Sequence, residues 1–189
     1  GTPLALILED DALLGDDLPA VLTEAATLQA RGVDFGLIRF LGNLKVISLL
    51  RPLRPIEEKP GHAPHALCRI YGTPGGAYGY IVTRDAAQRL LRATERCFVP
   101  IDVVHGEVWR TGIDAYALWP SPVLPDYEIE STMPPTRFQK SRQLLGWEKP
   151  AYPFTRMGYK VYEALFKNAS ALWTRLNDRP HVKRLGRGG

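Results

Sequence analysis

Three adjacent acidic residues, Glu9, Asp10 and Asp11, follow the apolar run Leu4–Leu8 in the stretch LALILEDDALL. Two like charges about 5 Å apart repel by roughly 3 kcal/mol at an effective dielectric constant of about 20. Carboxylates held this close therefore favour either a raised pKa or a bound cation. Oxygen ligands suit Mg²⁺ or Mn²⁺, which commonly bridge protein carboxylates and substrate phosphates. The triplet therefore predicts a divalent-cation site.

The backbone conformation of the triplet decides which of the acids converge. Side chains two residues apart on an extended strand point the same way, so Glu9 and Asp11 are expected on one side and Asp10 on the other. An alternative is that the acids cap the helix expected after them, because carboxylates favour a helix N-terminus. A cap needs only one acid, so three adjacent acids favour the cation site.

The apolar pattern of the chain predicts the α/β class. Residues 4–8 form a continuous apolar run, which is typical of a strand covered on both faces, and residues 13–30 have helical spacing. Further strands are expected at 35–40, 45–50, 67–71, 78–83 and 115–119, and helices at 84–96, 102–111 and 157–176. Two proline-rich stretches, 52–64 and 120–135, are expected to be loops.

A second block, GTPGGAYGYIVTRDAAQRLL at residues 72–91, concentrates glycines before an aromatic strand and a helix. Glycine permits a close approach of the backbone to a ligand. Thr83 is expected to cap the helix, with Asp85 in its first turn. Taken alone, the block fits an ordinary loop, strand and helix as well as it fits a ligand-binding segment.

Taken in order, these blocks resemble glycosyltransferase family 25, the lipopolysaccharide and lipooligosaccharide galactosyltransferases of Gram-negative bacteria. The family pattern places EDD after a hydrophobic strand, then a G-x-x-G-Y-x-I-S-R-x-A block, then a P-V-D block. This chain supplies them at residues 9–11, at 76–87 with Thr83 where serine is usual, and at 100–102 as Pro-Ile-Asp. The resemblance covers about residues 4–125.

The resemblance implies a GT-A-like, Rossmann-like nucleotide-sugar transferase fold in residues 1–136. It also implies a UDP-sugar donor, most often UDP-galactose, with Mn²⁺ or Mg²⁺. Transfer would be inverting, to a sugar hydroxyl of a lipopolysaccharide-type acceptor. Family members have a substantial segment before EDD, so we expect sequence upstream of Gly1. The alternative is an inactive remnant that binds a sugar nucleotide or an anionic membrane surface.

The same resemblance assigns roles to residues of the first two blocks. Asp11 would be the principal metal ligand, with Glu9 next to it. Glu9 and Asp10 would also contact the nucleotide. Gly79 and Tyr80 would line the sugar or acceptor side of the site.

Two carboxylates are candidates for the base that takes the proton of the acceptor hydroxyl, a group that must come within about 3 Å of the nucleophile. Asp102 and Glu107 lie five residues apart on the helix expected at 102–111, so they are only roughly on one face. Asp102 matches the family block and is the preferred base. It also suits a purely structural place at a helix N-terminus. His105, between the two acids, is expected to be structural.

The charge of the chain is divided unevenly. Residues 1–136 carry 12 Lys and Arg against 17 Asp and Glu, whereas residues 137–189 carry 12 against 3. We therefore expect a separate, basic, amphipathic helical tail after residue 136. A nucleic-acid partner is not expected, because the tail has no reader motif and the body is acidic. No apolar run reaches the roughly 18 residues of a membrane span.

The tail suits a peripheral place on the cytoplasmic face of the inner membrane, where a lipid-linked acceptor would lie. Basic residues next to an apolar helical stripe favour an anionic leaflet. The same stripe also suits packing on the α/β body, which we favour because Tyr162, Phe166 and Trp173 make good core residues.

Overall fold

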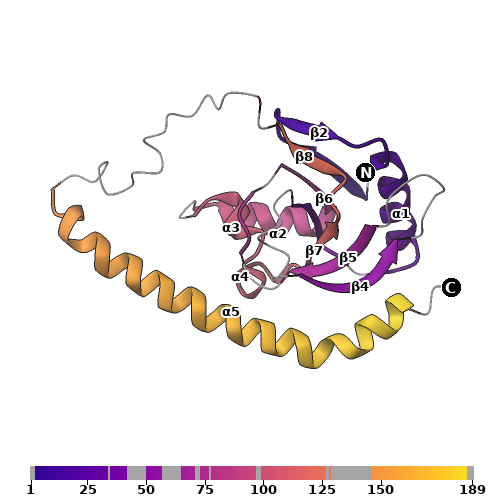
Figure 1. Cartoon of the computed structure of the whole chain (residues 1–189). Coiled ribbons are helices and arrows are strands. Elements are labelled where there is room, and N and C mark those ends of the chain that lie inside the picture. Colours follow the sequence, from indigo (N-terminus) through magenta and orange to yellow (C-terminus); the bar gives the residue numbers. More distant parts are fainter. Residues whose placement is uncertain are drawn as a thin grey trace.

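The computed structural model describes residues 3–33, 35–41, 50–56, 65–70, 73–76, 78–96, 99–126, 128 and 146–186. The strands are β1 (Leu4–Leu8), β2 (Ala12–Leu14), β3 (Leu37–Phe40), β4 (Leu50–Ile56), β5 (His65–Ile70), β6 (Gly79–Thr83), β7 (Ala115–Trp119) and β8 (Val123–Pro125). The helices are α1 (Leu18–Ala30), α2 (Arg84–Thr94), α3 (Ile101–Val104), α4 (Val108–Thr111) and α5 (Glu148–Gly186) (Figure 1).

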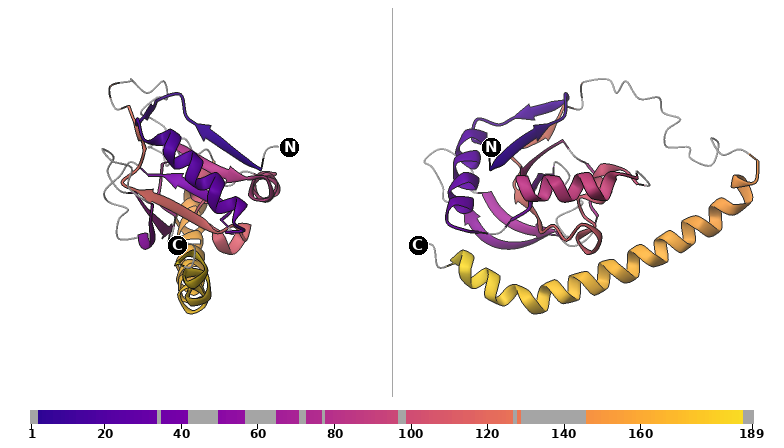
Figure 2. Two further views of the ribbon diagram at one scale, coloured as in Figure 1. Left: turned by 90° about the vertical axis from the view of Figure 1, so that its right-hand side faces the viewer. Right: turned by 180° about the vertical axis from the view of Figure 1, so that it is seen from behind.

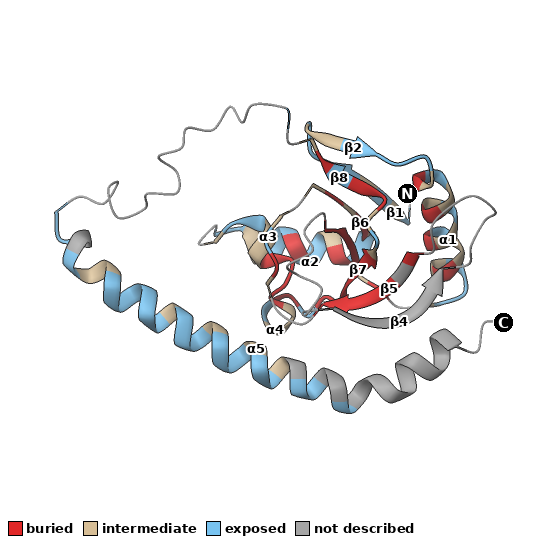
Figure 3. Cartoon of the chain, viewed as in Figure 1, coloured by how far each residue is buried: buried red, intermediate tan, exposed pale blue. Residues whose placement is uncertain are grey.

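The described strands form a mixed six-stranded sheet in the order β1-β6-β3-β7-β5-β4, with a separate β2-β8 ribbon. Strands β3 and β7 run parallel, and the other neighbours are antiparallel. Side chains alternate across a strand, so Ile38 and Phe40 pack with α1 while Leu37 and Leu41 pack with α2. The sheet is therefore the middle layer of the α/β body, and its central strands are buried (Figure 3). The predicted α/β class is confirmed.

Strand β1 has the bounds that the sequence predicts, but the prediction that both its faces are covered is wrong. In the described part of the chain β1 pairs only with β6, and it forms one edge of the sheet. Its residues Ile7 and Leu8 remain 42% and 37% exposed. An apolar run of five residues fits an edge strand as well as a central one.

The helix expected at 13–30 begins later, because residues 12–14 form strand β2 and pair with β8. The backbone N–H of Gly15 then donates to the carbonyl of Pro122, 2.9 Å away. Helix α1 starts only at Leu18, with Pro19 in its first turn, where the missing N–H costs nothing. The acidic triplet therefore does not cap a helix, and the capping alternative is excluded.

A further prediction fails where a short-range signal competes with strand pairing. The stretch 52–64 was expected to be a loop, but Pro52 and Pro55 lie in β4, an edge strand with a register shift between Pro52 and Arg54. Proline is tolerated at sheet edges because no ladder donor is needed there. The strand expected at 45–50 lies outside the described residues except for Leu50.

The helix expected at 102–111 is divided into α3 and α4. Glu107 has φ −83° and ψ 63°, which is not helical, so the two short helices are separated there. Asp102 and Glu107 consequently do not share a helix face.

Helix α5 contains the whole range 157–176 that the sequence assigns to a helix and extends beyond it at both ends. It runs past α4 and β4 along one side of the body (Figures 1 and 2). The prediction that its apolar stripe packs on the body is wrong for the described residues. Leu165, Leu172 and Trp173 are 64%, 61% and 70% exposed. The boundary expected at 136 lies outside the described residues.

We predict that Gly79→Ala lowers the free energy of unfolding by about 1–3 kcal/mol through overpacking. A Cβ at Gly79 would lie 2.8 Å from Cδ2 of Leu8 and 3.0 Å from Cδ2 of Phe40, so these side chains must move, and that of Phe40 is fully buried. Urea denaturation measures the change. The control is Gly158→Ala in α5, where a Cβ meets nothing within 4 Å and alanine should stabilise the helix by about 0.5–1 kcal/mol. The same change in unfolding free energy for both substitutions would contradict this packing.

Candidate functional site

The acidic triplet forms a turn. Strand β1 ends at Leu8, and the backbone N–H of Ala12 donates to the carbonyl of Glu9, 3.3 Å away. The argument from strand alternation is therefore wrong, although the turn still leaves Glu9 and Asp11 close in space. The backbone N–H of Glu9 donates to the carbonyl of Tyr78 at 3.0 Å, which fixes the turn beside the start of β6.

The carboxylates around this turn influence one another. Partial burial raises the pKa of Glu9, and the negative charges of Asp11, Asp102 and Asp10 raise it further, in that order. Asp102 is remote in sequence, so the fold brings the first and third blocks of the sequence together. That both segments belong to one site is what the resemblance to family 25 implies.

Asp102 lies in the first turn of α3 and is held by two backbone donors. Its Oδ2 accepts from the N–H of Gly76 at 3.1 Å, and its Oδ1 accepts from the N–H of Val103 at 2.8 Å. The first contact joins α3 to the glycine-rich segment before β6. Asp102 therefore has a structural role at the start of α3. Its negative charge also acts on Glu9 in the acidic turn.

The guanidinium of Arg39 contacts the same glycine-rich segment before β6. Arg39 is in the middle of β3 and only 1% exposed, and its Nη2 donates to the carbonyls of Pro74 (2.9 Å) and Gly76. Burial lowers the pKa of Arg39 to about 10, while Asp102 opposes the shift, so the side chain remains charged at neutral pH. Its Nε and Nη1 have no hydrogen-bond partner among the described residues.

Sequence reasoning missed Arg39 as a site residue. The available signal was one arginine within the otherwise apolar stretch FGLIRFL. A charged residue in a central strand is rarely buried unless it is paired, but its partners here are backbone carbonyls that the sequence does not reveal.

Tyr80 and His105 form an aromatic pair next to Arg39. Their ring centroids lie 4.6 Å apart in an edge arrangement. Burial, and then the positive charge of Arg39, lower the pKa of His105 to about 3, while the charge of Asp102 acts in the opposite direction. Burial and the charge of Glu9 raise the pKa of Tyr80. Tyr80 thus lies close to the acidic turn, and His105 is a neutral ring in the site.

Gly79 is buried at the start of β6, close to the side chains of Leu8 and Phe40. Its evident role is to let β1 and β3 approach β6. Its predicted role in lining the sugar side of the site stays a prediction.

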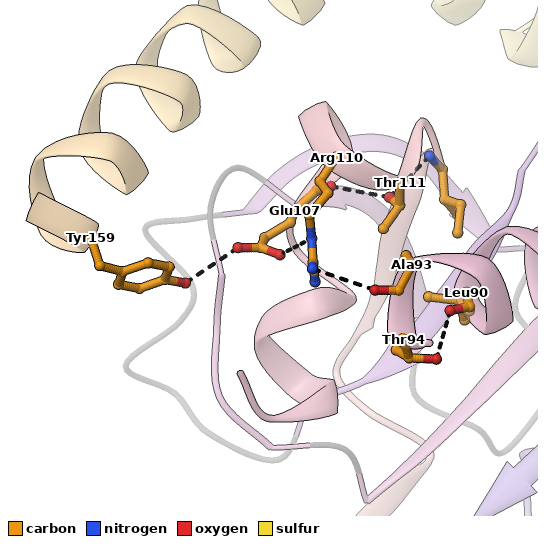
Figure 4. Close-up of polar contacts among 8 residues, drawn as sticks. Leu90, Ala93, Thr94, Glu107, Arg110, Thr111 and Tyr159 are labelled. Atoms are coloured by element: carbon orange, nitrogen blue, oxygen red, sulfur yellow. Dashed lines mark hydrogen bonds and ion pairs between the residues drawn. The ribbon is translucent and has the colours of Figure 1, made fainter. Parts of the chain in front are cut away.

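Glu107 lies in different surroundings from Asp102 (Figure 4). Its carboxylate is buried, forms an ion pair with Nε of Arg110 at 2.6 Å, and accepts from the hydroxyl of Tyr159 at 3.2 Å. Burial, and then the charge of Glu107, raise the pKa of Tyr159 to about 12. Glu107 thus ties α5 to α4, and the two base candidates do not converge.

The donor set can be tested against a divalent cation. Among the residues that the structure describes, no three His, Cys, Asp or Glu side chains form a ready metal cage. Oδ1 of Asp11 is buried without a hydrogen-bond partner in that same set. Mg²⁺ and Mn²⁺ sites often use only one or two carboxylates, with substrate phosphates and water completing the shell. Asp11 and Glu9 fit a site of this open kind.

A cavity of about 470 Å³ lies elsewhere. Its lining includes Thr83 at the end of β6 and Gly36 just before β3, whereas the acidic turn lies at the other end of both strands. None of the predicted site residues lines it. The cavity is therefore separate from the candidate site.

We predict that His105 makes the folded protein acid-sensitive. Burial lowers its pKa in the folded state to about 3 from the ordinary 6.5, so the unfolded state takes up the proton first as the pH falls. Between about pH 6 and about pH 4 the parent should lose about 1.4 kcal/mol of unfolding free energy per pH unit more than His105→Phe does. Urea denaturation across this range measures the difference. Parallel pH profiles would mean that His105 titrates normally.

The comparisons with known proteins identify the family of the chain. No curated protein matches the sequence. The model of glycosyltransferase family 25, described as an LPS biosynthesis protein, matches residues 2–105. The matched residues include the acidic turn, Arg39, Tyr80 and Asp102, and they end before Glu107 and α5. The match covers more than half of the chain, which therefore belongs to glycosyltransferase family 25.

Proposed function

We propose that the protein transfers a hexose, with galactose as the first choice, from a UDP-sugar to a sugar hydroxyl of a lipopolysaccharide- or lipooligosaccharide-type acceptor. Membership of family 25 supports glycosyl transfer in lipopolysaccharide biosynthesis. The proposal adds the donor, a GT-A-like site, a divalent metal and inversion at the anomeric carbon.

The observation that carries the proposal is the meeting of the acidic turn with Asp102. Two segments about ninety residues apart in sequence meet there: burial raises the pKa of Glu9, and the charges of Asp11, Asp102 and Asp10 raise it further. Such mutual repulsion is relieved when a cation binds or one group takes up a proton. A site that binds a nucleotide diphosphate with a metal ion, next to a catalytic base, would contain such a cluster of carboxylates.

The residues would divide the work as follows. Asp11 and Glu9 would hold Mn²⁺ or Mg²⁺, which supplies charge stabilisation to the departing diphosphate. Asp10, exposed at the same turn, would contact the nucleotide. Asp102 would take the proton of the acceptor hydroxyl as that oxygen attacks from the face opposite UDP. Its two backbone hydrogen bonds fix the orientation that such a base needs.

Tyr80 would line the sugar side of the site. Its ring packs edge-on against the neutral ring of His105, and this contact fixes the orientation of Tyr80. The charge of Glu9 and burial keep its hydroxyl protonated by raising its pKa. A protonated phenol can donate a hydrogen bond to a sugar hydroxyl or a phosphate oxygen.

The proposal places the acceptor on a lipid and the protein at the cytoplasmic face of the inner membrane. No helix among the described residues is long and apolar enough to cross a bilayer. Peripheral attachment would bring the site to a lipid-linked saccharide.

We predict that Asp11→Asn weakens Mn²⁺-dependent binding of UDP-galactose at least tenfold, because the substitution removes the charge of the principal metal ligand. Calorimetric titration with Mn²⁺, and then with EDTA, measures the binding. Asp16→Asn is the matched control, since Asp16 is an exposed acid in the segment after β2 and should bind the donor like the parent. Equal binding by Asp11→Asn and the parent would sink the metal assignment.

We predict opposite outcomes for the two base candidates. Asp102→Asn should lower kcat by about 100-fold or more for galactose transfer to deacylated lipooligosaccharide, with donor affinity nearly unchanged. Glu107→Gln should leave kcat within about threefold and instead lower the unfolding free energy by about 1–3 kcal/mol, because it weakens the contact with Arg110. A large loss of kcat in Glu107→Gln alone would transfer the role of base to Glu107.

A further inference from the structure

The side of α5 that faces the body carries a stripe of half-buried residues at intervals of four, four and three. These residues are Tyr159, Glu163, Lys167 and Ser170. Such intervals place side chains on one side of a helix. Tyr159 donates to Glu107 at 3.2 Å (Figure 4), and Glu163 accepts from the hydroxyl of Thr73 at 2.8 Å. Helix α5 is therefore attached to the body at two separate places.

The carboxylate of Glu163 is held as an anion between two donors. Its side chain is only 12% exposed, and its Oε2 forms an ion pair with Nζ of Lys160, 2.8 Å away. The hydrogen bond from Lys160 lowers the pKa of Glu163, burial opposes this shift, and the hydrogen bond from Thr73 lowers the pKa again. A hydrogen bond to an ionised acceptor is about twice as strong as one between neutral groups. The contact between Thr73 and Glu163 is therefore a strong attachment.

Side chains from three different elements hold the segment 73–76. Glu163 of α5 accepts from the first side chain of the segment. Nη2 of Arg39 in β3 donates to two of its carbonyls, and Oδ2 of Asp102 in α3 accepts from the N–H of Gly76 at 3.1 Å. The segment belongs to neither β5 nor β6, so these side-chain contacts determine its path.

The middle of this segment has little stiffness of its own. Gly75 and Gly76 are consecutive, and glycine has the largest backbone freedom of all residues. Gly76 also has φ +91°, a conformation that few other residues adopt. A segment of this kind keeps one path only if it is held at both ends. Asp102 holds it at Gly76, and Glu163 holds it at Thr73.

We propose that Glu163 is a positioning residue of the candidate site. By holding Thr73 it fixes the segment 73–76, and through the N–H of Gly76 it fixes the carboxylate of Asp102. Glu163 acts through the segment and has no contact with the reacting groups. The inference rests on the proposed function for the role of Asp102 as base. It gives α5, which the family match does not cover, a part in the geometry of the site.

Hydrogen exchange at the Gly76 amide, measured by NMR, tests this connection without any substrate. Thr73→Val removes the hydroxyl and keeps the shape of the side chain, so exchange at Gly76 should become about threefold faster or more. Thr73→Ser keeps the hydroxyl and should exchange like the parent. Glu163→Ala removes the acceptor and should have the effect of Thr73→Val. Because the two residues form one contact, the double variant should exchange no faster than the faster single variant.

The matched control is Tyr159→Phe, which removes the other hydroxyl contact of α5. That contact leads to Glu107 and not to the segment 73–76, so Gly76 should exchange as in the parent. Circular dichroism should show every variant folded, and Glu163→Ala replaces Thr73→Val if the latter fails to fold. Equal exchange at Gly76 in the parent and in Thr73→Val overturns the proposal. So does an equal acceleration in Tyr159→Phe, because it would mean that loosening α5 in general is responsible.

Kinetics test the consequence for transfer of galactose from UDP-galactose to deacylated lipooligosaccharide. Thr73→Val should lower kcat about tenfold and leave the donor Kd within about twofold, because a displaced base slows the chemical step without removing a donor contact. Thr73→Ser should restore kcat. Unchanged kcat despite faster exchange at Gly76 overturns the role in catalysis. A parent without any transfer contradicts the proposed function instead, and the exchange measurement then decides by itself whether Glu163 positions Asp102.

Discussion

The buried guanidinium of Arg39 is the interaction on which the candidate site depends. A charge in the middle of a central strand is costly unless its donors are used. Nη2 of Arg39 uses the carbonyls of Pro74 and Gly76, so the segment before β6 lies where the cation needs it. The N–H of Gly76 then reaches Asp102. One arginine thus connects the sheet, the glycine-rich segment and α3.

The balance of charge around Arg39 has a chemical consequence. His105 is neutral because burial and Arg39 lower its pKa to about 3, so it supplies no second positive charge. The acidic turn and Asp102 therefore outnumber the nearby cation, and their charges add to the rise in the pKa of Glu9 that burial mainly causes. A diphosphate would be repelled by such a surface unless a divalent cation came with it. This imbalance is why the proposed donor site includes a metal, with Asp11 and its unpartnered buried oxygen as the first ligand.

The sequence predicts the parts of the fold that local patterns determine. β1 and β7 have the predicted bounds, and α2 begins at the predicted cap, because Thr83 accepts from the N–H of Ala86 at 3.2 Å. Prediction from the sequence fails where segments distant in sequence pair with each other. The pairing of residues 12–14 with β8 converts a helical pattern into a strand. Pro52 and Pro55 are compatible with an edge strand once β5 is beside them.

The same division holds for the site. The resemblance to family 25 assigns the acidic turn and Asp102 to one site, although the order of the blocks in the sequence says nothing about their distance in space. The turn at Glu9 could not be anticipated, since a strand and a turn both permit three acids after an apolar run. Nor could Arg39 be anticipated, because its partners are backbone carbonyls. Backbone carbonyls leave no signal in the sequence, because every residue carries one.

Helix α5 has one side that makes directional polar contacts with the body and another side that exposes large apolar side chains. Polar contacts such as the one between Tyr159 and Glu107 are directional, so they set how the helix is rotated on the body. Apolar burial is not directional and needs only a surface to enter. In the described structure the body supplies that surface to few of the large side chains of α5. The family match ends at residue 105, before this helix begins. The apolar side of α5 therefore lies outside the matched residues, and its exposure has to be explained from its own physical chemistry.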